Sequence, residues 1–421
     1  MKKMLMAAGM AAVMTACGTA GQKAATDAGN PFLAEYSTPF GVPPFDLIKV
    51  EHYKEAFLKG MEEQKKEIDA IVNQRSVPDF DNTIAAFDQS GELLNKVSTV
   101  FSGLNSCNTN DEMQAFNKEI TPLLSAHRDD ISLNPALFAR VKEVYERREK
   151  LGLDKEQNKL LEETYKKFVR GGANLDSVDQ AKLRQLNSEI SMLQLTFGQN
   201  LLKETNAFEL VIDKKEDLAG LPESLVASAA EAAKGAGMEE KWLFTLHNPS
   251  VMPFLQYADN RELREKIFKG YINRGNNGNE ADNNEIVKKL VALRLEKAKL
   301  MGYADYASYI LEDRMAKNEE NVYRLLNQIW TPAVAKAKEE LSDIQSEIKK
   351  DGANFTPEGW DWRYYFEKAK KAKFSLDENE VRPYLELNNV REGAFYVANR
   401  LYGLPLIHIS EPTRPEPTSY A

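Results

Sequence analysis

The sequence predicts a mainly α-helical protein of many helices with one small β-hairpin, and three observations carry this prediction. Apolar residues recur at steps of three and four in several long stretches, which is the pattern of amphipathic helices. Only two short stretches are rich in β-branched and aromatic residues, which favour strands. Strands and helices do not alternate along the chain, and no fixed-period repeat occurs, so neither a parallel α/β sheet nor a helical-repeat solenoid is expected.

Composition places the chain among globular proteins. It has 421 residues, a hydrophobic fraction of 43% and a charged fraction of 28%, which excludes wholesale disorder. A chain of this length can bury more than one core, so we expect two or three domains. Lys and Arg total 55 against 64 Asp and Glu, a formal net charge of −9. This acidic balance argues against nucleic-acid binding, which needs a clustered excess of Lys and Arg.

Residues 1–16, MKKMLMAAGMAAVMTA, predict an export signal. Lys2 and Lys3 precede a run of apolar and small residues that is too short to span a bilayer of roughly 30 Å as a helix. The ending M-T-A-C is similar to a bacterial lipobox, although Met14 stands where Leu is usual, and in such a motif Cys17 is lipidated. The alternative is a plain signal peptide with an incidental cysteine. We expect an exported bacterial lipoprotein at the periplasmic face of a membrane, attached only through a lipid anchor at Cys17.

Residues 17–45 then predict a tether, because they are rich in Gly, Ala, Thr and Pro, and the prolines keep this stretch from being helical. The chain has one further cysteine, Cys107. If Cys17 is lipidated, no internal disulfide can form. We interpret Cys107 as an unpaired structural thiol rather than a nucleophile, because no His or basic residue stands near it in sequence.

Four stretches carry the apolar spacing of amphipathic helices. Their apolar residues, in chain order, are Tyr53, Phe57, Met61, Ile68, Ile71 and Val72; Leu183, Leu186, Ile190, Leu193, Phe197 and Leu201; Ile286, Leu290 and Leu293; and Val322, Leu325, Leu326, Ile329, Ala333, Ala337, Leu341, Ile344 and Ile348. The second stretch has near-heptad spacing, but it stops too soon for a coiled coil, so it predicts a helix packed in a bundle.

The last of these stretches has a clear start and an interrupted interior. Asn318, followed by Glu319 and Glu320, predicts an N-cap, with acceptors placed near the positive end of the helix. Pro332 falls inside the stripe, where it cannot donate the helical hydrogen bond and costs about 3 kcal/mol. We therefore expect a kink or a break at Pro332.

Two short segments predict the hairpin. Residues 208–212 (FELVI) and 242–246 (WLFTL) are apolar, aromatic and β-branched, so we expect them to pair antiparallel. A helical excursion is expected between them, at about 222–234. Further on, Arg274–Glu285 is rich in Gly and Asn, but its acids do not have the spacing of a calcium loop, so a turn followed by a helix N-cap is the better interpretation.

The residues alone assign no catalytic and no metal-binding residue. Nucleophile-elbow, phosphate-loop and dinucleotide-loop motifs are absent from the sequence. The four histidines are too far apart to place two of them on one helix face, as the zinc motif H-E-x-x-H requires. They are His52, at an expected helix start; His127, within a polar helix; His247, just after a strand; and His408.

Three long strings in the second half closely resemble the thimet-oligopeptidase-like zinc metallopeptidases, most of all the bacterial peptidyl-dipeptidase group. They are PSVMPFLQYADNRELREKIFKGYINRG (249–275), GNEADNNEIVKKLVALRLEKAKLMGYADYASY (278–309) and WDWRYYFEKAKKAKFSLDENEVRPYLELNNVREGAFYVANRLYGL (360–404). The resemblance covers roughly 40–404. It implies a two-lobed, nearly all-helical architecture with a deep channel, zinc held by H-E-x-x-H and a Glu on a following helix, and release of C-terminal dipeptides from short peptides. It also implies a monomer.

The chain departs from this family pattern near its end. In the family the H-E-x-x-H helix lies well beyond the string that ends here at Leu404, so no zinc ligand or catalytic Glu can be carried over. We therefore expect 46–248 to be the N-terminal helical domain and 249–404 the first part of the catalytic domain. The zinc-binding half is expected to be missing, so that the chain alone binds no catalytic zinc and is inactive.

The tail 405–421, PLIHISEPTRPEPTSYA, is rich in proline and looks foreign to the rest of the chain. It resembles translated sequencing-adapter DNA, and we hypothesise that it is an artefact joined to an interrupted gene. The alternative is a genuine short paralogue with a Pro-rich tail.

Two functions remain open from the sequence. The first is the N-terminal portion of a zinc-dependent oligopeptidase or peptidyl-dipeptidase that hydrolyses short peptides when complete. The second is a non-catalytic helical lipoprotein that binds peptides or scaffolds partners. In the first case, apolar faces that the missing half would cover should be exposed, above all Val322–Ile348 and Phe395–Leu401.

Overall fold

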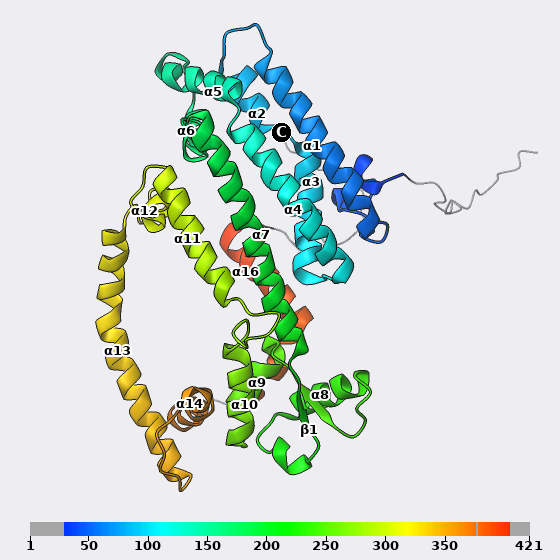
Figure 1. Ribbon diagram of the computed structural model, residues 1–421. Helices are drawn as coiled ribbons and strands as arrows, with labels where there is room; N and C mark the ends of the chain where they lie inside the picture. The colour runs from blue at the N-terminus through cyan, green and yellow to red at the C-terminus, as the bar shows by residue number, and fades with distance from the viewer. Residues whose placement is uncertain (1–28, 376–377, 405–421) are drawn as a thin grey trace, which may run out of the picture. The chain divides into compact units, whose positions relative to one another are not determined.

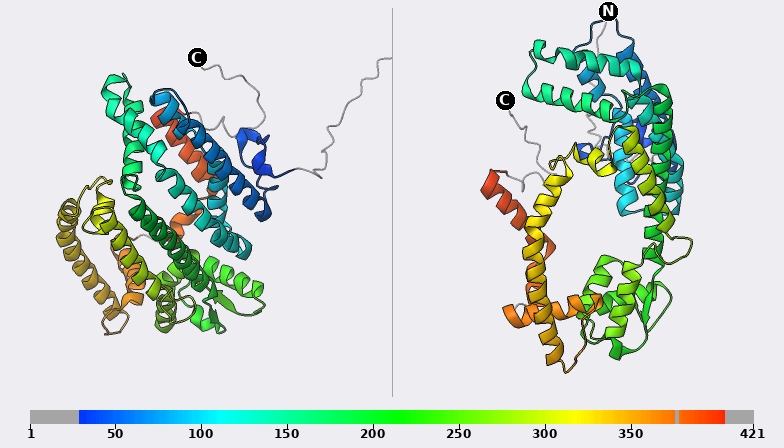
Figure 2. Two further views of the ribbon diagram at one scale, coloured as in Figure 1. Left: turned by 45° about the horizontal axis from the view of Figure 1, so that its top comes forward. Right: turned by 60° about the vertical axis from the view of Figure 1, so that its left-hand side comes forward.

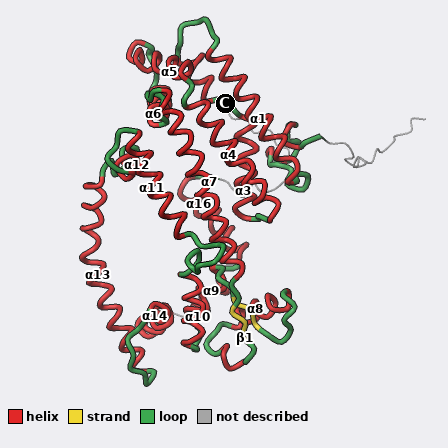
Figure 3. The backbone as a smooth tube through the Cα atoms, viewed as in Figure 1, coloured by secondary structure: helices red, strands yellow, loops and turns green. Residues whose placement is uncertain are grey.

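The computed structural model describes residues 29–375 and 378–404, and within them it confirms a mainly α fold with one small antiparallel pair of strands (Figures 1 and 3). The predicted signal at 1–16, Cys17, His408 and the tail 405–421 lie outside the described residues. Over the described ranges, no helix is both long enough and apolar enough to cross a membrane.

The chain divides into two compact units, Met1–Met192 (unit 1) and Leu193–Ala421 (unit 2), and the division falls inside helix α7 (Ser177–Ala207). The domain boundary between 248 and 249 stays a prediction. The hairpin strands share one core with the helices that follow them. Phe244 of the second strand, for example, meets Phe254 edge-on with ring centroids 4.7 Å apart. That shared core places 208–248 with unit 2.

Unit 1 is a bundle in which the predicted helix at 53–72 is confirmed. Its helices are α1 (Val50–Val72), α2 (Ala86–Asp88), preceded by a π-helical turn at Phe80–Ala85, α3 (Glu92–Cys107), α4 (Asp111–Ser132), α5 (Pro135–Arg147), α6 (Lys155–Arg170) and the first part of α7. Gly60 lets α1 approach α3 closely, because a Cβ there would stand 2.9 Å from the backbone of Leu94.

An aromatic cluster fills one core of unit 1. The rings of Tyr53, Phe57, Phe101 and Phe116 from α1, α3 and α4 lie at centroid distances between 5.0 and 6.4 Å. Phe32 adds a fifth ring, 5.1 Å from Tyr53, and is only 1% exposed. The predicted tether 17–45 is therefore anchored to the core at this point, since burying an aromatic side chain stabilises the contact by about 1.5–3 kcal/mol.

Unit 2 contains the predicted hairpin. Strands β1 (Leu210–Ile212) and β2 (Trp242–Phe244) pair antiparallel in the register Leu210↔Phe244, and α8 (Glu223–Gly235) lies between them in sequence. The other helices are α9 (Asn248–Tyr257), α10 (Arg261–Ile272), α11 (Asn284–Leu300), α12 (Tyr306–Leu311), α13 (Glu319–Lys350), α14 (Gly359–Phe374), α15 (Glu378–Val381) and α16 (Leu387–Tyr402).

At Pro332, where a kink or a break was expected, helix α13 is not broken. The cap is as predicted, because the Asn318 side chain accepts from the Asn321 N–H at 2.9 Å. The helix nevertheless runs through Pro332 without interruption, and Figure 2 shows it as one continuous coil in both views. Pro332 is exposed, so water can bind the carbonyl group that loses its helical partner, and the break is avoided.

The apolar stripe of α13 is exposed along its first part only. Leu325, Ile329 and Trp330 are 54–70% exposed, as are several residues of α16, of which Leu401 is 67% exposed. Further along α13 the expectation of exposure was wrong. Ile344 and Ile348 are fully buried, because Tyr364 and Tyr365 of α14 pack against them.

The turn predicted in Arg274–Glu285 is confirmed, and a carboxylate from another helix organises it. Glu204 of α7 accepts hydrogen bonds from the Gly275 backbone N–H and from the side-chain amides of Asn277 and Asn279. Burial opposes its charge, but these three donors outweigh burial and hold the pKa of Glu204 below its ordinary value. The expected N-cap position falls on Asn283, whose side chain instead donates to the Phe197 carbonyl group.

A buried ion cluster joins α10 to α14. Asp361, fully buried, accepts from Arg264 at 3.0 Å and from Arg261 at 2.7 Å, and it also accepts from the Glu358 backbone N–H. Arg264 is 1% exposed and donates as well to the carbonyl groups of Ala258 and Trp360. Burial opposes the charge on Asp361, but the donors prevail and its pKa is lowered.

We predict that Asp361→Asn destabilises unit 2 by about 3–5 kcal/mol, because it leaves the buried Arg264 without a counter-charge. Asp343→Asn is the matched control. It removes an exposed 3.8 Å pair with Lys373 and should change the free energy of unfolding by less than about 1 kcal/mol. Urea unfolding followed by circular dichroism measures both, and equal effects of the two substitutions would contradict the role given to Asp361.

His127 of α4 is the one buried histidine among the described residues, at 5% exposure. Its Nε2 lies 2.7 Å from Gln64 Oε1, which can only accept, so Nε2 carries the proton. Nδ1 is buried without a hydrogen-bond partner. Burial, and secondarily Lys65, lowers the pKa of His127, while Asp130 opposes the shift, so the neutral imidazole is the stable form in the folded chain.

This predicts a pH dependence of stability. Below the ordinary pKa of 6.5 the unfolded chain takes up a proton that folded His127 resists, so stability falls as the pH drops from 6.5 towards the lowered folded value. His127→Gln should flatten this slope in urea unfolding between about pH 5 and 7.5. The control is His247→Gln, at an exposed position in unit 2. An identical flattening by both substitutions would show that His127 is not the cause of the pH dependence.

Candidate functional site

The structure places the three described histidines, none of which the sequence assigned to a metal site, on separate elements. His52 lies in the first turn of α1, where its Nδ1 accepts from the Lys49 N–H at 3.0 Å. His127 is bound to Gln64. His247 precedes α9, with its two nitrogens 3.0 Å from Thr245 Oγ1 and 3.1 Å from Asn206 Oδ1.

These environments do not fit a zinc site. Each described histidine is engaged by a neighbour that is not a metal ligand, and within the described ranges no three His, Cys, Asp or Glu side chains gather to hold a metal ion. Cys107, at the end of α3, is exposed and unpaired, as predicted for it.

One cavity, with a volume of about 840 Å³, lies in unit 2. Helix α8, the segment that follows β2, helix α9 and the turn around Arg382 form its walls. Such a volume falls in the range of small-ligand pockets, roughly 300–1,000 Å³. Apolar side chains such as Leu225, Leu243 and Met252 dominate the lining.

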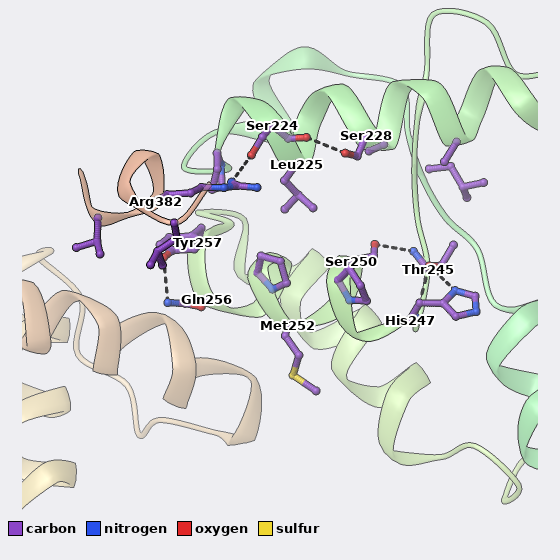
Figure 4. A pocket seen from close by; sticks show the side chains of 18 residues that line it. Ser224, Leu225, Ser228, Thr245, His247, Ser250, Met252, Gln256, Tyr257 and Arg382 are labelled. Carbon is purple, nitrogen blue, oxygen red and sulfur yellow. Dashed lines mark hydrogen bonds between the residues drawn. The ribbon is translucent and has the colours of Figure 1, made fainter. Parts of the chain in front are cut away.

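Polar groups stand at the two ends of this cavity (Figure 4). At one end Arg382 reaches α8 and donates to Ser224 Oγ at 2.7 Å. At the other end Ser250 Oγ accepts from the Thr245 backbone N–H at 3.0 Å, and the Thr245 hydroxyl group lies beside His247.

The arrangement can bind but shows no nucleophile with a base. Ser250 Oγ accepts a hydrogen bond from the Thr245 backbone N–H and makes none with His247, so a serine–histidine pair is not formed. Among the described residues, Arg382 is the one Lys, Arg, Asp or Glu that lines the cavity. An apolar body with a polar or anionic end is the chemistry that this cavity suits.

Sequence reasoning named none of the cavity residues as a site residue, and it located His247 only as a residue just after an expected strand. The cavity residues come from distant segments of the chain, since Leu225 and Arg382 lie more than a hundred residues apart. Neither these two nor Met252 belongs to a short motif. The one available signal was that Arg382 falls in the string 360–404, which resembles a peptidase family.

Comparison with known proteins bears out that resemblance. Residues 254–416 match peptidase family M3. The chain is 40% identical over 379 residues to the dipeptidyl carboxypeptidase of Escherichia coli and 38% identical to that of Salmonella typhimurium, with 90% of this chain covered in each case. The chain is homologous to the peptidases of family M3. It is also 28% identical to oligopeptidase A of Salmonella typhimurium, over 89% of this chain.

These matches cover most of this chain but only part of the relatives. The M3 match extends past Leu404 to residue 416, so it includes most of the segment that the sequence analysis interpreted as foreign. In the other direction, the chain spans only 55–56% of the length of these relatives.

Proposed function

We propose that this chain is part of a zinc-dependent M3 peptidase that acts on short peptides and releases dipeptides from their C-terminus. The observation that carries the proposal is the 40% identity, over 90% of the chain, to a protein named for that activity. Zinc in such a peptidase would supply an activated water near neutral pH. The described residues of this chain do not gather its ligands, so we derive no catalytic step from them.

A chimera tests the proposal. Joining this chain to the portion of the E. coli dipeptidyl carboxypeptidase that it does not match should restore a zinc-dependent enzyme, and the chain alone with added zinc should cleave nothing. The measurement is release of a C-terminal dipeptide from a short peptide with a free C-terminus, with and without a chelator. The control is a chimera in which the glutamate of the grafted H-E-x-x-H motif is replaced by glutamine.

The outcomes separate the alternatives. Chelator-sensitive dipeptide release by the chain alone would contradict the expectation that it lacks a zinc site. A folded chimera that binds the peptide without cleaving it would contradict the peptidase proposal and favour the non-catalytic peptide-binding lipoprotein.

We further propose that the chain is exported and anchored by a lipid on Cys17. The support is the basic start, the short apolar run and the cysteine that follows it. In a bacterial host given labelled palmitate, the chain should be labelled and should sediment with membranes, whereas Cys17→Ser should abolish both. Cys107→Ser is the matched control, because Cys107 is exposed and unpaired; label lost equally in both variants would refute the anchor.

A further inference from the structure

Unit 1 holds a second cavity, which we call the bundle cavity, with a volume of about 480 Å³. It lies among helices α1, α2, α3, α4 and α6, and every residue that lines it belongs to unit 1. Spaces between bundle helices are common places for small-molecule sites, and this volume is within their usual range of roughly 300–1,000 Å³.

The wall of the bundle cavity is largely apolar, and part of it is tightly packed. Phe168 of α6 is 3% exposed and lies against Phe87, with ring centroids 5.4 Å apart. Leu94 of α3 and Leu124 of α4 complete this apolar wall. The buried ring of His127 joins it, held by the bond from Nε2 to Gln64. Such a surface favours a hydrocarbon or aromatic body.

The charged residues of the lining are all cationic. Arg128 and Lys167 line the cavity, and no Asp or Glu among the residues that the structure describes does so, although the chain as a whole carries a net charge of −9. Both side chains are exposed, and neither makes an ion pair within the described part of the chain. The nearby carboxylate of Asp130 is instead engaged by Lys65 and Arg184. Two uncommitted cations beside an apolar wall are complementary to an anion.

Three hydroxyl groups add donors to the same lining. Ser98 and Ser102 lie one turn apart on α3, and Ser132 lies at the end of α4. None of the three hydroxyl groups makes a hydrogen bond within the described residues, although the hydroxyl group of a helical serine often donates to a carbonyl group of the preceding turn. Their hydroxyl groups are therefore available to a ligand.

We propose that the bundle cavity binds a carboxylate attached to an apolar body. The body would contact Phe168 and Leu124, while the carboxylate would accept from Arg128, which can bind it through two N–H groups, and from Lys167. This chemistry is shared by free aliphatic or aromatic acids and by an apolar C-terminal residue of a peptide. The site is separate from the cavity of unit 2 and does not depend on the proposed peptidase activity.

Calorimetric titration of the full chain with 4-phenylbutyrate and with its neutral amide tests the proposal. The acid should bind at least about tenfold more tightly than the amide, since only the acid offers a charge to Arg128 and Lys167. Its affinity should fall when salt is raised from about 0.05 to 0.5 M, because both cations are exposed to solvent. A short peptide ending in phenylalanine, with a free or an amidated C-terminus, then distinguishes the two sources of the carboxylate.

Variants locate the ligand. Arg128→Gln and Lys167→Gln should each lower the affinity for the acid at least about fivefold, as loss of a charged hydrogen bond implies. Lys118→Gln is the matched control, because it is exposed on the same helix as Arg128 but does not line the cavity. Ser98→Phe, which fills the cavity, should abolish binding; if that variant fails to fold by circular dichroism, the two charge variants decide.

Four results would overturn the proposal. The first three are equal affinity for acid and amide, equal effects of Arg128→Gln and Lys118→Gln, and absence of binding to the folded chain. Loss of binding in Arg382→Gln with Arg128→Gln unaffected would also overturn it, because the acid would then occupy the cavity of unit 2.

Discussion

The buried carboxylate of Asp361 is the constraint on which the packing of unit 2 depends. It draws Arg261 and Arg264 of α10 onto α14, about a hundred residues later in the chain, and Arg264 in turn satisfies the carbonyl groups of the turn before α10. With α14 held there, Tyr364 and Tyr365 can cover Ile344 and Ile348 of α13. A buried charge network of this kind tolerates little loss, since each group left unpaired in a low-dielectric interior is costly.

A similar arrangement links α7 to the turn before α11. Glu204 gathers the donors of that turn, so a Gly- and Asn-rich segment that could resemble a cation loop is instead a cap around a carboxylate supplied by another helix. In both places a single carboxylate accepts hydrogen bonds from several donors, which would otherwise bind water. The helices that bear the M3 resemblance are thereby joined into one unit, with an apolar cavity beside the hairpin.

The elements themselves were largely predictable. Helix α1, helix α7 and the strand pair follow from local periodicity and residue type, because amphipathic spacing within one segment is visible without knowledge of its partner. Of the kink or break expected at Pro332, the break does not occur, because the cost of proline in a helix depends on whether water can reach the freed carbonyl group. Ile344 and Ile348 were misjudged as well, since only the position of α14 decides that they are covered.

The amino-acid sequence by itself determined the helical class, the hairpin, and the family resemblance that comparison bears out. It also predicts the export signal. Those properties depend on spacing, composition and long strings that can be compared residue by residue. Only the tertiary structure decided where the two units divide, which apolar faces are covered, and which side chains meet in the two cavities. Arg128, Lys167 and Ser98 come from three helices, and no local pattern brings them together. Burial and charge complementarity arise from contacts between distant segments, which the order of residues does not display.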